Sequence, residues 1–195
     1  MPTPSTFAPV ALEHASRLIN HGPTVLVTSQ DGARRNIMAA AWSMPVEFTP
    51  PRIAVVIDKQ TFTRELIHAS GTFGLCIPGV AAIDLTYAVG SVSGREIDKF
   101  THFDIPAIAG PVLGLPLLET GCAAWMECRL IPEPHTEDAY DTCFCEVVSA
   151  AADPRAFRNG HWELDASNGD LHTIHHLGAG NFVRAGDSIK ARPLK

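Results

Sequence analysis

The sequence predicts a mainly β protein, a closed or partly closed antiparallel barrel with a few short helices. Six or more strand-like runs, rich in β-branched and apolar residues, follow one another along the chain, and most are separated by short turns. Only two or three segments have helical spacing, and all are short. Hairpin-connected strands favour an antiparallel sheet over βαβ units, and closing such a sheet removes its exposed edges.

The first third of the chain predicts a helix or turn and then three strands. Residues 6–20 have apolar residues at the spacing of a short helix or turn, followed by a loop at 21–23. The run 24–29 ends at Asp31-Gly32, a dipeptide typical of hairpins. The returning strand spans 36–48, and a third strand spans 52–58. These short connections predict a three-stranded antiparallel meander.

A helix over 61–70 comes next, with Thr61 or Thr63 as its N-cap, Glu65 in its first turn and Gly71 just past its end. Further strands are expected at 72–79, 122–131 and 140–153. Between the first two of these, residues 80–104 begin as a helix and become a polar loop. A turn at 168–170 precedes a final extended or looped segment.

Composition limits the class of protein. A chain of 195 residues fits one domain, and its net charge of −6 would repel a nucleic-acid backbone. No apolar run reaches the roughly 18 residues of a membrane span, and the N-terminus lacks the pattern of a secretory signal. The five cysteines are odd in number and mostly lie in apolar runs, which predicts reduced thiols and a cytoplasmic location.

Three segments are candidates for ligand binding. The common nucleotide fingerprints GxxxxGK[ST] and GxGxxG are absent, but the helix start Thr61-Phe62-Thr63 offers free amides and hydroxyls to a phosphate. An ordinary capped helix is the alternative. Residues 36–43 combine three small alanines with Trp42, which leaves room for a planar ring; Trp42 would either cover that ring or fill the core, and composition favours the core. The loop 91–100 carries Arg95 and Lys99, and its alternative is a solvated loop with local ion pairs.

Metal and hydrolase sites have weaker support. His172 and His176 have the spacing of half a zinc site, but no second pair matches it, so no metal is expected. The G-x-S-x-G element of many hydrolases is missing.

These same segments resemble the flavin reductase-like, FMN-binding split-barrel family, most closely its flavoredoxin-type branch. The matching stretches are GPTVLVTS, NIMAAAWSMPVEFTPPRIAVVID, TFTRELIHASGTFGLCIP, SVSGREIDKF, EVVSA and GAGNF, in this order from about residue 20 to 185. Their order and spacing are more specific than any single piece. The resemblance implies a Greek-key split β-barrel, one FMN-binding domain over 1–195, and a homodimer with FMN at the interface.

The resemblance also implies roles for particular residues. Asn36 and the segment Ala40, Ala41, Trp42 and Ser43 would line the isoalloxazine and ribityl chain of FMN. Thr61 and Thr63 would hold the phosphate. Lys99 would approach the edge of the flavin ring, where a positive charge stabilises the reduced form, and Phe182 would cover part of the cofactor. No residue is assigned as general acid or base.

One departure from the family pattern affects the expected reaction. Many relatives carry a His just before a Gly-Glu-Val-like strand segment, on the nicotinamide side of the flavin, whereas residues 139–147 here contain none. His135 could substitute for it only if its loop folds back. The expected activity is hydride transfer from NAD(P)H to bound FMN, with a possible redox partner protein. The alternatives are a flavoredoxin-like electron carrier that does not oxidise NAD(P)H, and a binding module without flavin.

Overall fold

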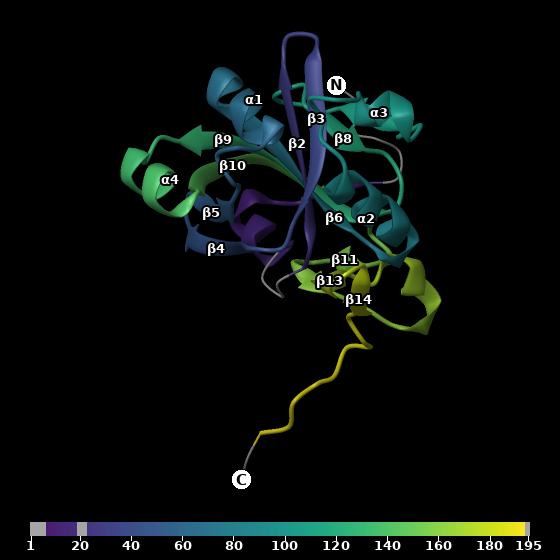
Figure 1. The fold of residues 1–195 in the computed structure, drawn as a ribbon. Coiled ribbons are helices and arrows are strands. Elements are labelled where there is room, and N and C mark those ends of the chain that lie inside the picture. Colours follow the sequence, from purple (N-terminus) through teal and green to yellow (C-terminus); the bar gives the residue numbers. More distant parts are fainter. Residues whose placement is uncertain (1–6, 19–22, 194–195) are drawn as a thin grey trace.

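The computed structural model describes residues 7–18 and 23–193, and most of them form one antiparallel barrel with the α-helices packed around it (Figure 1). The strands of the main sheet are β1 (Ala8–Pro9), β2 (Val25–Asp31), β3 (Arg34–Ala40), β4 (Ser43–Phe48), β5 (Pro51–Val56), β6 (Thr72–Pro78), β9 (Cys122–Ile131) and β10 (Thr142–Ala152). Three two-stranded pairs stand apart: β7 (Ala107–Ala109) with β8 (Pro116–Leu118), β11 (Phe157–Arg158) with β12 (His161–Trp162), and β13 (Ile174–Gly178) with β14 (Asn181–Arg184).

The helices are short. The α-helices are α1 (Phe62–Ser70), α2 (Ile83–Ser91), α3 (Lys99–His102) and α4 (Pro134–Tyr140), and the 3₁₀ helices are η1 (Leu12–Leu18), η2 (Val80–Ala82) and η3 (Ala166–Leu171). None of the helices in the described part of the chain is long and apolar enough to cross a bilayer.

The main sheet has the strand order β3-β2-β6-β9-β10-β5-β4, with β1 added beside β10. All of its pairs are antiparallel. The two ends of this order, β3 and β4, are consecutive in sequence and are joined only by Ala41 and Trp42. The Trp42 carbonyl accepts a hydrogen bond from the Val56 amide at 2.9 Å. The barrel is therefore split between β3 and β4, and the connection between them crosses the opening.

The predicted three-stranded meander is wrong at this point. The expected strand 36–48 is two strands, because β2 begins at Val25, opposite Ala40, and offers no partner beyond it. The chain leaves the ladder at Ala41 and joins the other end of the sheet as β4. The Asp31-Gly32 hairpin between β2 and β3 is confirmed, with Gly32 at a φ of 59°.

Other local predictions differ less. The segment 6–20 contains a 3₁₀ helix and the short strand β1, and its expected loop at His21 and Gly22 lies outside the described residues. The polar loop after α2 contains α3. Helix α4 was not predicted and takes Tyr140 out of the expected strand 140–153. The expected turn at 168–170 is part of η3.

The barrel has apolar side chains on both faces of its central strands. Val25, Val27 and Phe73 belong to the interior cluster, whereas Leu26 and Trp125 pack on the outside, beneath the helices. Successive side chains of a strand point to opposite faces, so a strand covered on both sides is apolar throughout. Because side chains fill the interior, a ligand site must lie outside the barrel.

Candidate functional site

Two adjoining cavities run along the outer side of β3. The first, which we call the helix-start cavity, has a volume of about 310 Å³ and is lined by β3, residues 60–63, residues 89–95 and Lys99. The second, the hairpin cavity, has a volume of about 180 Å³ and is lined by Thr24, residues 39–41, α2, His176 and Phe182. Ala39, Gly90 and Ser91 line both cavities. The two form one elongated groove with a polar end and an aromatic end.

The helix-start cavity is built around the first turn of α1, as the capping signals predicted. Thr61 is the N-cap: its Oγ1 accepts the Arg64 amide at 3.2 Å and donates to the Asp58 carbonyl at 2.8 Å. Gly71 ends the helix in the left-handed conformation. The amides of Phe62 and Thr63 start the helix and have no acceptor within it. They provide donors and the positive end of the helix dipole for an anion.

Asn36 connects this helix to β3. Its Nδ2 donates to Thr63 Oγ1 at 2.8 Å, and both side chains are buried. Asn36 Oδ1 is buried without a hydrogen-bond partner, although it belongs to a residue that lines the cavity. An unpaired buried acceptor is costly unless a ligand or water completes it. The carboxamide is also confined by Gly94, where a Cβ atom would lie 2.2 Å from Oδ1.

Lys99 lies at the floor of the same cavity and is 3% exposed. Its Nζ donates to the carbonyls of Ile37 at 2.9 Å and Val89 at 2.7 Å, so it joins β3 to α2. Burial lowers the pKa of Lys99 to about 8. The ammonium thus brings a positive charge close to the polar end of the groove while two of its protons are held by the backbone.

Arginines border the polar end. Arg34 and Arg95 lie over the Phe62 ring at 6.0 and 5.7 Å from its centroid, and Glu65 bridges the two guanidinium groups. Arg95 Nη1 also donates to the Gln60 carbonyl at 2.8 Å. Because Arg34 is half exposed and each cation is paired with Glu65, their net field is modest.

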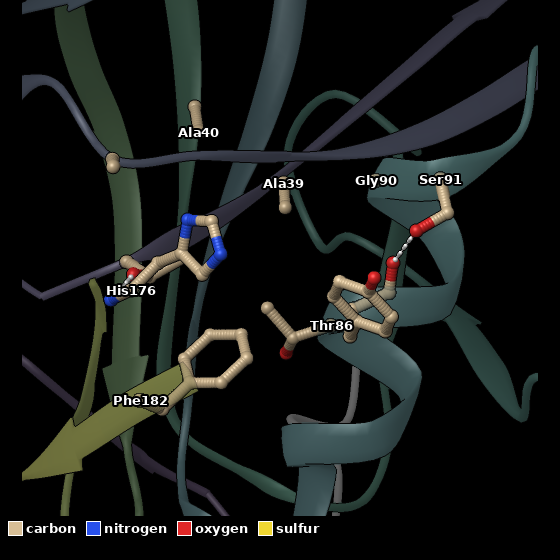
Figure 2. Close-up of a pocket in the computed structure, with 10 residues that line it drawn as sticks. Ala39, Ala40, Thr86, Gly90, Ser91, His176 and Phe182 are labelled. Carbon is tan, nitrogen blue, oxygen red and sulfur yellow. Dashed lines mark hydrogen bonds between the residues drawn. The ribbon is translucent and has the colours of Figure 1, made fainter. Parts of the chain in front are cut away.

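The hairpin cavity has a different character (Figure 2). The rings of His176, on β13, and Phe182, on β14, have centroids 4.9 Å apart, and both project into the cavity opposite Ala39. The turn between these strands carries positive φ angles at Gly178, Ala179 and Gly180, and its Gly180 lies against the Tyr87 ring of α2. The ionisable groups that line this cavity are His176 and Tyr87.

The predicted site residues therefore fall into three groups. Asn36, Thr61, Thr63 and Lys99 meet in the helix-start cavity, and Ala40, Ala41 and Phe182 meet in the hairpin cavity. Trp42 and Ser43 line neither cavity. Trp42 is 73% exposed, so its expected place in the core is wrong, and Ser43 has a buried Oγ without a partner. The roles assigned to all nine residues stay predictions.

Sequence reasoning missed Tyr87, His176 and the close approach of Gly94. His176 was considered only as half of a zinc site. Its expected partner His172 is buried, with Nδ1 2.8 Å from the Ala185 carbonyl and Nε2 2.9 Å from the Asp165 carbonyl. No metal-binding group of three or more His, Cys, Asp and Glu residues occurs in residues 7–18 and 23–193. A signal was present in GAG at 178–180, since two glycines between extended residues mark a tight hairpin.

His135 lies on α4, where its ring packs edge-on against Tyr140 at 5.8 Å. It lines neither cavity of this groove.

The structure is a split antiparallel barrel whose outer groove joins a helix start with free amides to a small aromatic cavity. The chain belongs to the flavin reductase like domain family, whose model matches residues 17–171. It has the FMN-binding split-barrel fold of that family.

Individual relatives agree with this assignment. The chain is 61% identical to the uncharacterized protein YddH of Escherichia coli (strain K12), over 96% of this chain and 99% of the relative. It is 40% identical to the FMN-binding domain of a flavin reductases-like enzyme from Shewanella baltica OS155, with a TM-score of 0.92 over 98% of this chain and all of that structure. Flavoredoxin of Desulfovibrio vulgaris (Miyazaki F) shares the fold, with 24% identity, a TM-score of 0.73, and coverage of 87% of this chain and 90% of the other.

Proposed function

We propose that the groove binds FMN, with the phosphate at the start of α1 and the isoalloxazine ring in the hairpin cavity. The observation that carries this proposal is Asn36 Oδ1, a buried acceptor without a partner at the polar end of the groove. The hydroxyl and amide donors of the ribityl chain and ring of FMN could complete it. The Phe62 and Thr63 amides would receive the phosphate.

Different residues of the chain would contact different parts of such a ligand. Asn36 and Thr63 are fixed to each other by a hydrogen bond, so they would keep the polar end in one orientation. Lys99 would place its charge near the ligand without moving, because the Ile37 and Val89 carbonyls hold it. His176 and Phe182 would cover the ring and exclude water from it.

The reaction we propose is hydride transfer from NAD(P)H. When bound, FMN would supply a ring able to take up a hydride and release electrons, and the protein would contribute orientation and electrostatics. Two findings support an oxidoreductase: the chain belongs to the flavin reductase like domain family, and it is similar to the FMN-binding domain of a flavin reductases-like enzyme from Shewanella baltica OS155. The five cysteines are all buried and unpaired, which supports work in a reducing compartment such as the cytoplasm.

A second candidate is a flavoredoxin-like electron carrier that holds FMN but is reduced by a partner protein. One observation favours it: β10 has no histidine, and His135 packs against Tyr140 away from the groove. An electron carrier needs no nicotinamide site.

We further propose that the functional unit is a homodimer with the groove at its interface. The exposed apolar side chains Trp42, Met44, Val46 and Phe48 lie on and just before β4, at one end of the sheet. We call this set the β4 apolar edge. Ala41, next to Trp42, lines the hairpin cavity, so a second copy covering this edge would also close the cavity.

Two measurements test the proposal. The visible spectrum of the purified protein, before and after incubation with FMN and gel filtration, is expected to show a retained flavin band. A protein that stays colourless and leaves FMN fluorescence unchanged contradicts FMN binding. Stopped-flow mixing of the FMN-loaded protein with NADH or NADPH is expected to bleach the band. Retained flavin that neither nucleotide bleaches would assign the electron carrier instead.

A further inference from the structure

The chain leaves the barrel after a well-defined anchor. The Ala185 amide donates to the Thr173 carbonyl at 2.8 Å, and the Ser188 amide donates to the Leu164 carbonyl at 2.9 Å. Ser188 Oγ in turn accepts the Leu164 amide at 3.1 Å. Beyond this point residues 189–193 run outward as an extended segment that points away from the barrel (Figure 1). We call residues 189–193 the C-terminal arm.

The composition of the arm is that of a contact segment. Ile189 is 94% exposed, the largest exposure among the large apolar side chains of the described residues. Lys190 and Arg192 give the arm positive charge without a carboxylate, in a chain whose net charge is −6. An isoleucine side chain in water does not stabilise an isolated extended segment, whereas burying that side chain on another surface is favourable.

The β4 apolar edge is a surface of matching character. Trp42, Met44 and Phe48 are 73%, 57% and 69% exposed, and with Val46 they stand within seven residues of one another. Single exposed apolar residues are ordinary, but a concentration on one sheet edge marks a contact surface. As the end of the strand order, β4 pairs with β5 alone among the described strands, and η1 packs beside it. The exposed Glu47 adds a negative charge between the apolar side chains.

We propose that the C-terminal arm of one copy docks on the β4 apolar edge of a second copy of this chain. The inference rests on the homodimer proposed above and names the segment that holds it together. Ile189 packs among the apolar side chains of the edge, and Lys190 meets the carboxylate of Glu47. Each copy offers one arm and one edge, so a twofold pair satisfies both contacts at once. The arm thereby covers the rim of the partner's groove beside Ala41.

Sedimentation equilibrium, with and without FMN, compares the dimer dissociation constant of the full chain with those of three variants. A stop after Ser188 removes the arm but keeps both anchors, Ile189→Asp places a carboxylate at its centre, and Val112→Asp makes the same change at a residue 54% exposed elsewhere. The stop and Ile189→Asp are expected to raise the dimer dissociation constant at least tenfold. Val112→Asp is expected to leave it unchanged.

Cross-linking locates the contact independently of affinity. Equal amounts of ¹⁴N- and ¹⁵N-labelled protein are mixed and treated with a carbodiimide, which joins the Lys190 amine to a nearby carboxylate. Mixed-isotope peptides joining Lys190 to Glu47 are expected. A dimer that keeps its dissociation constant in both arm variants, or Lys190 links found only within one chain, overturns the docking proposal while the dimer stands. A full chain that sediments as a monomer throughout overturns both.

Discussion

The two ends of the groove are built in opposite ways. The helix-start cavity is made of buried polar side chains on regular elements, tied to one another by the Asn36–Thr63 bond and the two Lys99 bonds. The hairpin cavity is walled by more exposed rings on a two-stranded pair outside the main sheet. The side chains of the polar end are therefore fixed to one another and to β3 by hydrogen bonds. The rings of the aromatic end stand on a hairpin that is joined to the barrel through Thr24, whose amide donates to the Ile174 carbonyl at 2.8 Å and whose Oγ1 accepts the His176 amide at 2.9 Å, and that packs on Tyr87. Preorganised groups lose less entropy on binding, so the polar end should dominate ligand affinity.

Gly94→Ala should have the largest effect, because the new Cβ atom would lie 2.2 Å from Asn36 Oδ1 and 2.9 Å from the Phe62 ring. Either the loop or the carboxamide must move, at a cost of about 1–3 kcal/mol. We expect FMN affinity, measured by quenching of flavin fluorescence, to fall by about 10–100-fold. Gly169→Ala is the matched control, since nothing lies within 4 Å of its added Cβ. If the two variants bind FMN with equal affinity, the helix-start cavity is not part of the FMN site.

The buried charge of Lys99, at the polar end of the groove, makes the stability of the protein depend on pH. Burial lowers its pKa to about 8, whereas a lysine in the unfolded chain titrates near 10.4. Between these values the unfolded chain holds a proton that the folded protein has released, so the free energy of unfolding rises with pH. Relative to Lys99→Met, the wild-type protein should gain about 1–3 kcal/mol between pH 7.5 and 10.5.

Urea unfolding of the two proteins at matched pH values measures this difference. Lys59→Met, at a lysine whose side chain is 53% exposed and lies 3.6 Å from Asp141, is carried through the same pH series as the surface-lysine control. A Lys99 difference that falls with pH, or does not change, would show that the ammonium is not desolvated in the folded protein.

Thr63→Val removes one hydroxyl at nearly constant volume and leaves the buried Asn36 Nδ2 without its acceptor. We expect about tenfold weaker FMN binding, and a smaller loss for riboflavin, which lacks the phosphate. Thr63→Ser should restore most of the affinity. If FMN and riboflavin weaken equally, the phosphate does not lie at the start of α1.

Phe182→Ala should have the smallest effect and the opposite ligand pattern. Loss of one aromatic contact corresponds to about 3–10-fold weaker binding, the same for FMN and riboflavin, with no change in urea stability. His176→Ala should behave in the same way. A loss confined to FMN would reverse the assignment of the two ends.

The contrast between the two ends also explains what could be predicted from the sequence. Thr61, Gly71 and the Asp31-Gly32 turn act on their immediate neighbours, so α1 and the first hairpin were predicted correctly. Asn36, Thr63 and Lys99 were named by the family resemblance, and the fold brings them together. The break at Ala41 depends on where β2 begins, sixteen residues earlier, and the strand order depends on pairings across the whole chain. The contact of His176 with the groove depends in turn on the hairpin packing against α2, which no local pattern reports.

The two-residue connection between β3 and β4 would couple ligand release to local opening of the barrel. Ala41 lines the hairpin cavity and also carries the chain across the split in the barrel. A ligand in the proposed site would contact the same segment that joins the two sheet ends, so local opening of that segment would also open the site. The ligand would dissociate during such openings. The rate of ligand dissociation would therefore follow the rate of local opening between β3 and β4. Amide hydrogen exchange at Val56, which donates to the Trp42 carbonyl, would slow as the ligand binds.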